Sequence, residues 1–249
     1  MAESPRRTLL LTGASRGIGH ATVKRFASAG WRVITCSRHP FPEDCPWEAG
    51  EEDHVQVDLS DPNSTIAAVE DIRGRLAAGS GGRLEALVNN AGISPKGPEG
   101  ERLDTLTTDL RTWGKVFHVN FFASVVLARG LRAELMAAKG AVVNVTSIAG
   151  ARVHPFAGAA YATSKAALAA LTREMAHDFG PLGVRVNAIA PGEIETAILS
   201  PGTEKLVEQI PMRRLGRPEE VARTIYYLCT AESSYVSGVE IEINGGQHV

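Results

Sequence analysis

Seven short runs of aliphatic and β-branched residues alternate with longer segments of helical pattern, and this alternation limits the fold more than any other feature of the chain. The runs are TLLLT (8–12), RVITCS (32–37), HVQVDL (54–59), LEALVN (84–89), AVVNVTS (141–147), VRVNAIA (184–190) and VEIEI (239–243). Most of them are continuously apolar, as strands buried on both faces must be. Strand–helix–strand repeats with right-handed crossovers form a parallel sheet covered by helices on both faces. We therefore predict an α/β fold with seven parallel strands.

The chain reads as one domain over residues 1–249. Its 249 residues and 44% hydrophobic content suit a single α/β domain of the larger kind. GSGG (79–82) is only a turn before the fourth strand, and no linker divides the chain. The stretch 39–53 has too many prolines and acids for a regular element, so we expect a surface excursion after the second strand.

The charge and cysteine patterns exclude several classes of protein. The net charge is −2 with acids and bases interspersed, which argues against a nucleic-acid or membrane partner. No window approaches about 18 uninterrupted apolar residues, and the start MAESPRR does not look like a signal peptide. Neither the three cysteines nor the seven histidines have metal-ligand spacing. We expect a soluble cytoplasmic protein with no metal site.

A glycine-rich turn follows the first strand directly. In TGASRGIGHATVKRF, Gly13, Gly17 and Gly19 precede an amphipathic helix. Glycine permits positive φ and keeps a Cβ away from an approaching pyrophosphate, while a helix N-terminus offers free N–H groups and a positive dipole end. The position after the first strand favours a dinucleotide-binding loop over a plain tight turn.

The residues after the second and third strands bear on which dinucleotide is bound. An acid after the second strand would hold the ribose hydroxyls, whereas a base would accept a 2′-phosphate. The chain has Ser37 and Arg38 there, and Arg16 in the glycine loop could join Arg38. This favours NADP and leaves NAD open, with two solvated arginines as the alternative. Asp58 could accept a hydrogen bond from the adenine amino group or cap the next turn. NNAG (89–92) suits a close approach to a ligand, an Asx-turn, or both.

A tyrosine and a lysine share one helix face in YATSK (161–165). Ser147 ends the fifth strand, so Ser147 and Tyr161 should meet at the carboxyl edge of the sheet, with Lys165 one helical turn further. A cation within about 4 to 6 Å would lower the pKa of the phenol from about 10. We therefore expect Tyr161 to serve as a general acid and base.

Together these motifs resemble those of the short-chain dehydrogenase/reductase family, over essentially the whole chain. The resemblance rests on TGASRGIG (12–19), Asp58, NNAG (89–92), Asn120 in FHVNFF, Ser147, YATSK (161–165), PGEIET (191–196) and VSGVEIEINGG (236–246). It implies a Rossmann-like doubly wound sheet in a single domain. It also implies a catalytic set of Asn120, Ser147, Tyr161 and Lys165, in which Lys165 binds the nicotinamide ribose and Asn120 holds a water that links Lys165 to solvent. Asn120 itself is expected in a long helical stretch, about 109–138.

The resemblance further implies a nicotinamide cofactor, NADP by preference. Its expected contacts are Gly13, Ser15, Arg16, Gly17, Ile18, Gly19, Ser37, Arg38, Asp58, Leu59, Asn90, Ala91, Gly92, Tyr161, Lys165, Pro191, Gly192, Ile194 and Thr196. The backbone of Ile194 and the hydroxyl of Thr196 would fix the nicotinamide carboxamide. The implied reaction interconverts a carbonyl and a secondary alcohol, with Ser147 and Tyr161 on the substrate oxygen and Tyr161 supplying the proton.

The substrate is expected to contact segments 93–108, 148–160 and 193–215. The motifs lie nearest those of 3-oxoacyl thioester reductases, and sugar, polyol and steroid enzymes share them. A non-catalytic dinucleotide-binding sensor or scaffold is the alternative from another class. His154 could face the substrate, but a surface or packing role has more weight. Glu193 and Glu195 are expected to be solvated strand-end acids.

Two partners are considered beside the small-molecule substrate. The alanines of KAALAAL (165–171) permit close helix packing, and family members commonly form tetramers through this helix and the C-terminal strand, so we expect a homotetramer. Arg129, Arg132 and Arg173 could dock an acyl carrier protein, but surface arginines on helices are usually only solvated.

Overall fold

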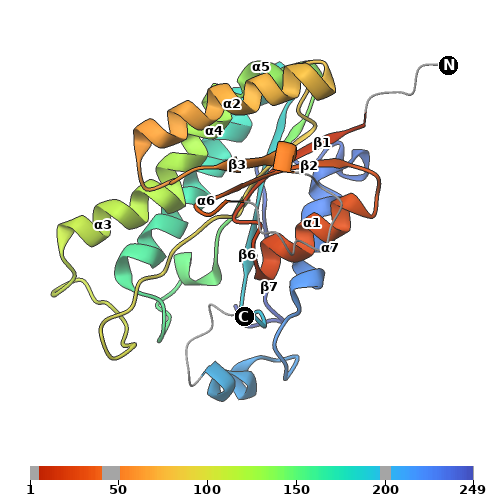
Figure 1. The fold of residues 1–249 in the computed structure, drawn as a ribbon. Coiled ribbons are helices and arrows are strands. Elements are labelled where there is room, and N and C mark those ends of the chain that lie inside the picture. The colour runs from red at the N-terminus through yellow and green to blue at the C-terminus, as the bar shows by residue number, and fades with distance from the viewer. Residues whose placement is uncertain (1–5, 41–50, 197–202, 249) are drawn as a thin grey trace.

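Seven strands form one parallel sheet in the order β3-β2-β1-β4-β5-β6-β7 (Figure 1). The structure is a computed structural model, and it describes residues 6–40, 51–196 and 203–248. The strands are β1 (Thr8–Thr12), β2 (Arg32–Ser37), β3 (His54–Gln56), β4 (Ala86–Asn89), β5 (Ala141–Val145), β6 (Arg185–Pro191) and β7 (Glu240–Ile243). This confirms the predicted Rossmann-like α/β fold.

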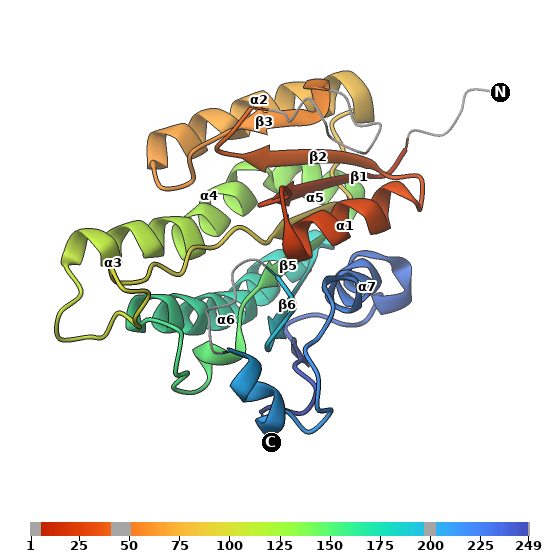
Figure 2. The same ribbon diagram turned by 60° about the horizontal axis from the view of Figure 1, so that its bottom comes forward.

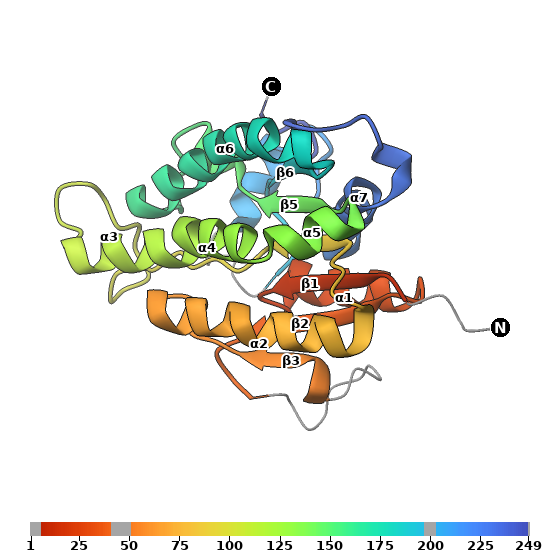
Figure 3. The ribbon, with the colours of Figure 1, turned by 90° about the horizontal axis from the view of Figure 1, so that it is seen from above.

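Helices cover the sheet on both faces, and each face has its own apolar core. The helices are α1 (Gly17–Ala27), α2 (Pro62–Ser80), α3 (Leu110–Phe117), α4 (Ala123–Gly130), α5 (Arg132–Ala138), α6 (Ala159–Phe179) and α7 (Pro218–Cys229). Figure 2 shows α1 and α7 together on one face, where Phe26 and Ile225 are fully buried. Figure 3 shows α2, α4 and α6 on the other face, whose core includes Ile72 and Leu127.

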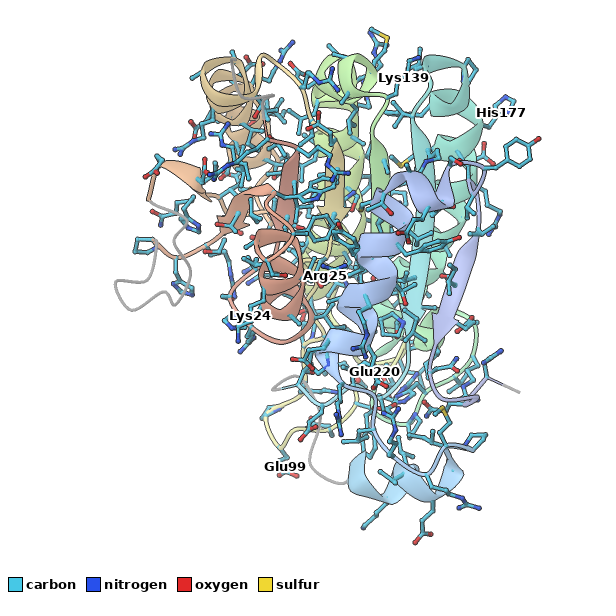
Figure 4. All side chains as sticks on the ribbon, turned by 90° about the vertical axis from the view of Figure 1, so that its right-hand side faces the viewer. Lys24, Arg25, Glu99, Lys139, His177 and Glu220 are labelled. Carbon is cyan, nitrogen blue, oxygen red and sulfur yellow. The ribbon has the colours of Figure 1, made fainter. Side chains whose placement is uncertain are left out.

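The strand order reverses next to β1, and this topology determines where a ligand can bind. Leu10 of β1 pairs with Ile34 of β2 on one side and with Leu87 of β4 on the other. In such sheets the chain leaves the two strands in opposite directions, which opens a crevice at their carboxyl ends. Figure 4 shows the two ends of the strands: Lys139 comes just before β5 and lies at one end of the molecule. Glu99, in the loops after β4, lies at the opposite end, on the side of the carboxyl ends.

Three of the differences from the predicted element boundaries lie near the carboxyl edge of the sheet or change a helix. β3 stops at Gln56 instead of residue 59, because Asp58 turns the chain by accepting a hydrogen bond from the Ser60 N–H at 2.9 Å. β5 stops at Val145 instead of residue 147. The long helix expected over about 109–138 is three helices, with a π-helical segment at His118–Phe122 between α3 and α4 and a break at Leu131. Such π-helical segments often occur at functional sites.

The excursion at 39–53 lies largely outside the described residues, which omit 41–50. Its return is a short 3-10 helix, Glu51–Asp53, that is tied to the sheet by an ion pair between Asp53 and Arg32 at 2.7 Å. Among the residues that the structure describes, no helix is both long and apolar enough to cross a membrane. The same residues contain no group of three or more acids, histidines or cysteines placed to hold a metal ion.

Candidate functional site

The glycine loop joins β1 to α1, and its packing leaves no room for a side chain at Gly13 or Gly19. Gly13 and Gly17 have φ of +71° and +55°. A Cβ on Gly19 would lie 2.0 Å from the carbonyl oxygen of Gly13. Helix α1 begins at Gly17, and its N-cap residue Arg16 makes no side-chain capping bond, so the first N–H groups of the helix have no side-chain acceptor there. The loop thus has the open backbone that an anion requires.

Asn90 holds this loop in place. Its amide nitrogen donates to the carbonyl oxygens of Thr12 and Gly13 at 3.0 and 2.9 Å. The backbone N–H groups of Asn90 and Ala91 in turn donate to the Thr12 hydroxyl. The NNAG segment is therefore a support for the glycine loop as well as a wall of the site.

A cleft of about 330 Å³ runs along the carboxyl ends of the strands. Every residue predicted to contact a cofactor lines this cleft, and so do Ser147, Tyr161 and Lys165 of the predicted catalytic set. Residues lining it that the prediction did not name as cofactor contacts include Cys36, His39, Val57, Ser60, Ile93, Ser94, Lys96, Lys115, Val119, Thr146, His154, Phe156 and Glu193.

One end of the cleft has the features expected around an adenosine. Arg16 and Arg38 are exposed there, and Ser37 at the end of β2 donates its hydroxyl hydrogen to the carbonyl of His39. Asp58 both caps the turn after β3 and lines the cleft, so its two predicted roles are compatible. Hydrogen bonds from the backbone and side chain of Ser60, with a smaller effect of the Arg38 charge, lower the pKa of Asp58.

The other end of the cleft brings together Ser147, Tyr161 and Lys165. Ser147 follows β5, and Tyr161 and Lys165 lie in the first part of α6. The Lys165 side chain is buried, its Nζ donates to the carbonyl of Val145 at 2.7 Å, and Nζ lies 5.8 Å from the centroid of the Tyr161 ring. This is the predicted grouping of a hydroxyl, a phenol and an ammonium.

The pKa of Tyr161 is shifted in the opposite direction from the one expected. Burial raises the pKa of the Tyr161 phenol, a hydrogen bond with Ser147 opposes the rise, and the charge of Glu193 adds to it. Burial lowers the pKa of Lys165 to about 8. The expected lowering of the tyrosine pKa is therefore wrong for this structure, because desolvation of the buried phenol is the largest effect on that pKa.

Asn120 does not line the cleft, although it lies close to Lys165. Its side-chain oxygen accepts from the Ile93 N–H at 2.8 Å, and its amide nitrogen donates to the Ile93 carbonyl and to the Ser164 hydroxyl. A Cβ on Gly92 would contact both Lys165 Nζ and this oxygen, at 3.3 and 3.6 Å. The π-helical segment thus places Asn120 behind the cleft, where it ties α6 to the loop after β4.

Two of the segments predicted to face the substrate are bonded to each other. The Ala159 N–H donates to the Leu103 carbonyl at 2.9 Å, and Arg102 Nε donates to the Ala157 carbonyl at 2.8 Å. Lys96 Nζ donates to the carbonyl of Phe156. Segments 93–108 and 148–160 therefore form one wall. The third segment, 193–215, includes residues 197–202, which lie outside the described residues.

His154 and Glu193 form a buried pair in the cleft. His154 Nε2 lies 2.6 Å from Glu193 Oε1, and the two residues are 8% and 7% exposed. The prediction that Glu193 is solvated is wrong, whereas Glu195 is exposed as predicted. His154 is buried and lines the cleft. The prediction had given a surface or packing role more weight than a position facing the substrate.

The residues present fit a dinucleotide. The glycine loop and the start of α1 suit its pyrophosphate, since a Cβ on Gly17 would lie 2.9 Å from a methyl carbon of Thr196 across the cleft. The arginine-rich end suits an adenosine, and the polar end around Lys165 suits a second ribose. Because both ends belong to one cleft, a single extended ligand can span them.

Comparison with known proteins agrees with this geometry. A family model described as enoyl-(acyl carrier protein) reductase matches residues 13–248. Protein FixR of Bradyrhizobium diazoefficiens is 61% identical over 245 residues, which are 98% of this chain and 87% of that protein. A 3-oxoacyl-(acyl-carrier-protein) reductase, FabG of Aquifex aeolicus, is 36% identical, with 95% of each chain covered.

A solved structure extends the likeness to three dimensions. An oxidoreductase of the short-chain dehydrogenase/reductase family from Brucella ovis, in complex with a partially ordered NAD, is 63% identical. The match covers 96% of this chain and all of that one, with a TM-score of 0.84.

Proposed function

This chain belongs to the short-chain dehydrogenase/reductase family of oxidoreductases, and on that premise we propose that it transfers a hydride between a nicotinamide cofactor and a carbonyl or secondary alcohol. The observation that carries the proposal is the grouping of Ser147, Tyr161 and Lys165 at the end of a cleft whose other end is a dinucleotide-type glycine loop. A scaffold that only bound the nucleotide would have no use for a phenol, a hydroxyl and an ammonium beyond the glycine loop.

In this proposal each polar group has a distinct task. When bound, a nicotinamide cofactor would supply or accept the hydride. Ser147 and Tyr161 hydrogen-bond the substrate oxygen, and Tyr161 gives it a proton in reduction or removes one in oxidation. Lys165, whose ammonium lies beside the phenol, stabilises the phenolate that reduction leaves and offers further donors to the cofactor ribose. Asn120 positions α6 and the loop after β4 around Lys165.

The raised pKa of Tyr161 bears on the direction of the reaction. A phenol with a raised pKa holds its proton at neutral pH, which suits a general acid for carbonyl reduction. For alcohol oxidation the same group must first lose the proton. We therefore expect oxidation to gain more than reduction as the pH rises.

We propose that NADP is preferred over NAD. Arg16 and Arg38 both line the cleft, and a serine ends β2 where a ribose-binding acid would stand. The Brucella ovis relative was solved in complex with a partially ordered NAD, so NAD is the alternative cofactor. The test compares kcat/KM for NADPH and NADH. Arg38→Ala should reduce the ratio of NADPH to NADH efficiency at least about tenfold, whereas Arg129→Ala, on the surface of α4, should leave it unchanged.

The experiment for the reaction itself uses purified protein with either cofactor and a panel of carbonyl compounds that includes a 3-oxoacyl thioester, a sugar and a steroid. Tyr161→Phe should abolish turnover while retaining cofactor binding. Cofactor binding with no turnover on any compound, in either direction, would refute the proposed hydride transfer and favour a non-catalytic sensor or scaffold.

We also propose a cytoplasmic homotetramer. Helix α6 exposes the small residues Ala166 and Ala170, and β7 is an edge strand of the sheet, so both surfaces predicted for association are accessible. Burial raises the pKa of Cys36 and Cys229 to about 12, which keeps both as thiols. Analytical ultracentrifugation should give four times the chain mass of 26.5 kDa, and cell fractionation tests the location.

A further inference from the structure

The part of the cleft next to Tyr161 is polar, although apolar acyl chains are among the candidate substrates. His154 and Glu193 are buried there, and half-buried Lys96 lines the same cleft. The three residues come from three different segments, 93–108, 148–160 and 193–215. Burying polar and charged side chains disfavours folding unless they are hydrogen-bonded, so their presence calls for a chemical reason.

The hydrogen bonds of His154 determine its tautomer. The Phe156 N–H donates to His154 Nδ1 at 3.2 Å, so Nδ1 carries no proton. Nε2 then carries the ring proton and donates to Glu193 Oε1 at 2.6 Å. In this arrangement the imidazole has one ring proton, and Glu193 Oε1 is its acceptor.

The carboxylate of Glu193 lies at the cleft, and among the described residues its printed side-chain partner is the imidazole of His154. Its charge acts on the Tyr161 phenol and also on the ammonium of Lys96. A carboxylate accepts several hydrogen bonds, so one N–H from His154 leaves it with capacity for more. A substrate that lies between these groups can supply a further donor.

Lys96 offers the complementary chemistry. Its ammonium donates to the Phe156 carbonyl, and burial, followed by the nearby charge of Arg102, lowers its pKa. An ammonium has three donors, and one hydrogen bond leaves two for a ligand. The wall of the cleft thus has an acceptor, Glu193, and a donor, Lys96, within reach of each other's charge.

We propose that Glu193, oriented by His154, accepts a hydrogen bond from a hydroxyl group next to the reacting carbon of the substrate, and that Lys96 donates to the same hydroxyl or to its neighbour. A hydroxyl is both donor and acceptor, which matches this pair. The substrate class is therefore a hydroxylated carbonyl compound or polyol, of the sugar type. An acyl chain offers no donor to this carboxylate. This inference rests on the proposed hydride-transfer function.

The test uses pairs of ketones in which a hydroxyl is replaced by a methyl group of similar size. Hydroxyacetone is compared with butanone, and dihydroxyacetone with diethyl ketone, each by cofactor-coupled kcat/KM. An acetoacetyl thioester and threonine, which carries an ammonium beside its alcohol, complete the panel. We expect the hydroxylated member of each pair to be preferred at least about tenfold, because the methyl analogue leaves the buried polar groups unpaired.

Variants then assign this preference to residues. Glu193→Gln should reduce the hydroxyl-to-methyl ratio at least about tenfold, and Lys96→Met should reduce it as well. Glu195→Gln is the matched control, because Glu195 is the same residue type two positions further along and is exposed. A purely structural defect would lower both members of each pair and leave the ratio intact.

Each outcome decides between the alternatives. A preference for the methyl analogues or the thioester, or a ratio that Glu193→Gln does not change, overturns the inference and leaves the proposed reaction standing. A preference for threonine overturns it in favour of an ammonium ligand. If no compound turns over, the proposed function fails. Calorimetry of xylitol binding to the cofactor complex, in wild type and Glu193→Gln, then decides the inference separately, with equal affinity as the contradicting result.

Discussion

Replacing Gly19 by alanine should damage cofactor binding, although alanine favours helices. Gly19 lies in the first turn of α1, and a Cβ there would lie 2.0 Å from the Gly13 carbonyl oxygen and 2.7 Å from the Asn90 amide nitrogen. Alanine in a helix is worth about 1 kcal/mol over glycine. Overpacking costs about 1 to 3 kcal/mol, so the net effect on the free energy of unfolding is zero to about 2 kcal/mol of destabilisation.

The Gly19→Ala change should alter the Kd for NADPH more, relative to wild type, than it alters the free energy of unfolding. The clash displaces the Gly13 carbonyl and the Asn90 amide that fixes the loop. Losing one hydrogen bond to a charged phosphate costs about 1.5 to 3 kcal/mol, which is a roughly ten- to hundredfold rise in Kd for NADPH. Fluorescence titration measures the Kd, and urea unfolding measures the stability.

Gly74→Ala is the matched control for this prediction. Gly74 is an exposed glycine inside α2, and no heavy atom lies within 4 Å of its Cβ position. Alanine there should raise the free energy of unfolding by about 1 kcal/mol and leave the Kd unchanged. If Gly19→Ala bound NADPH with the wild-type Kd and gained as much stability as Gly74→Ala, cofactor binding would not depend on the close packing around Gly19.

Three further predictions concern buried polar groups. Because burial lowers the pKa of Lys165 from 10.5 to about 8, the unfolded chain keeps this proton where the folded protein releases it, so stability should rise by ~3 kcal/mol between pH 8 and 10.5. Lys165→Met should lack this rise in urea unfolding across that range. Glu193→Gln removes a charge that raises the pKa of Tyr161, so the pH dependence of alcohol oxidation should move to lower pH in kcat/KM profiles. Asn120→Ala leaves the backbone polar groups of Ile93 without their side-chain partner and should destabilise the fold by about 2 to 4 kcal/mol in urea unfolding.

The fold and much of the cleft follow from local patterns. Continuous apolar runs predict buried parallel strands, and parallel strands bring their carboxyl ends to one edge. Residues at the strand ends, such as Gly13, Asn90 and Ser147, are therefore placed together by topology alone. For the same reason, all the predicted cofactor contacts line one cleft.

What the sequence did not predict depends on contacts between distant segments. His154 and Glu193 are 39 positions apart, and no periodicity links them, so their pairing is visible only once the two loops are folded. The break of the long helix at His118–Phe122 has no proline to announce it. It coincides with the hydrogen bonds of Asn120 to Ile93 and Ser164, which are tertiary contacts.

The charges around Tyr161 argue for turnover over a structural role for the cleft. Lys165 is 3% exposed and Glu193 is 7% exposed, and a lone buried charge disfavours folding. The two have opposite signs, yet each is hydrogen-bonded to another group, Lys165 to the Val145 carbonyl and Glu193 to His154, instead of forming an ion pair with the other. A chain shaped only for stability gains nothing from this arrangement. A chain that must move a proton through a phenol gains a cation that favours its release and an anion that favours its retention.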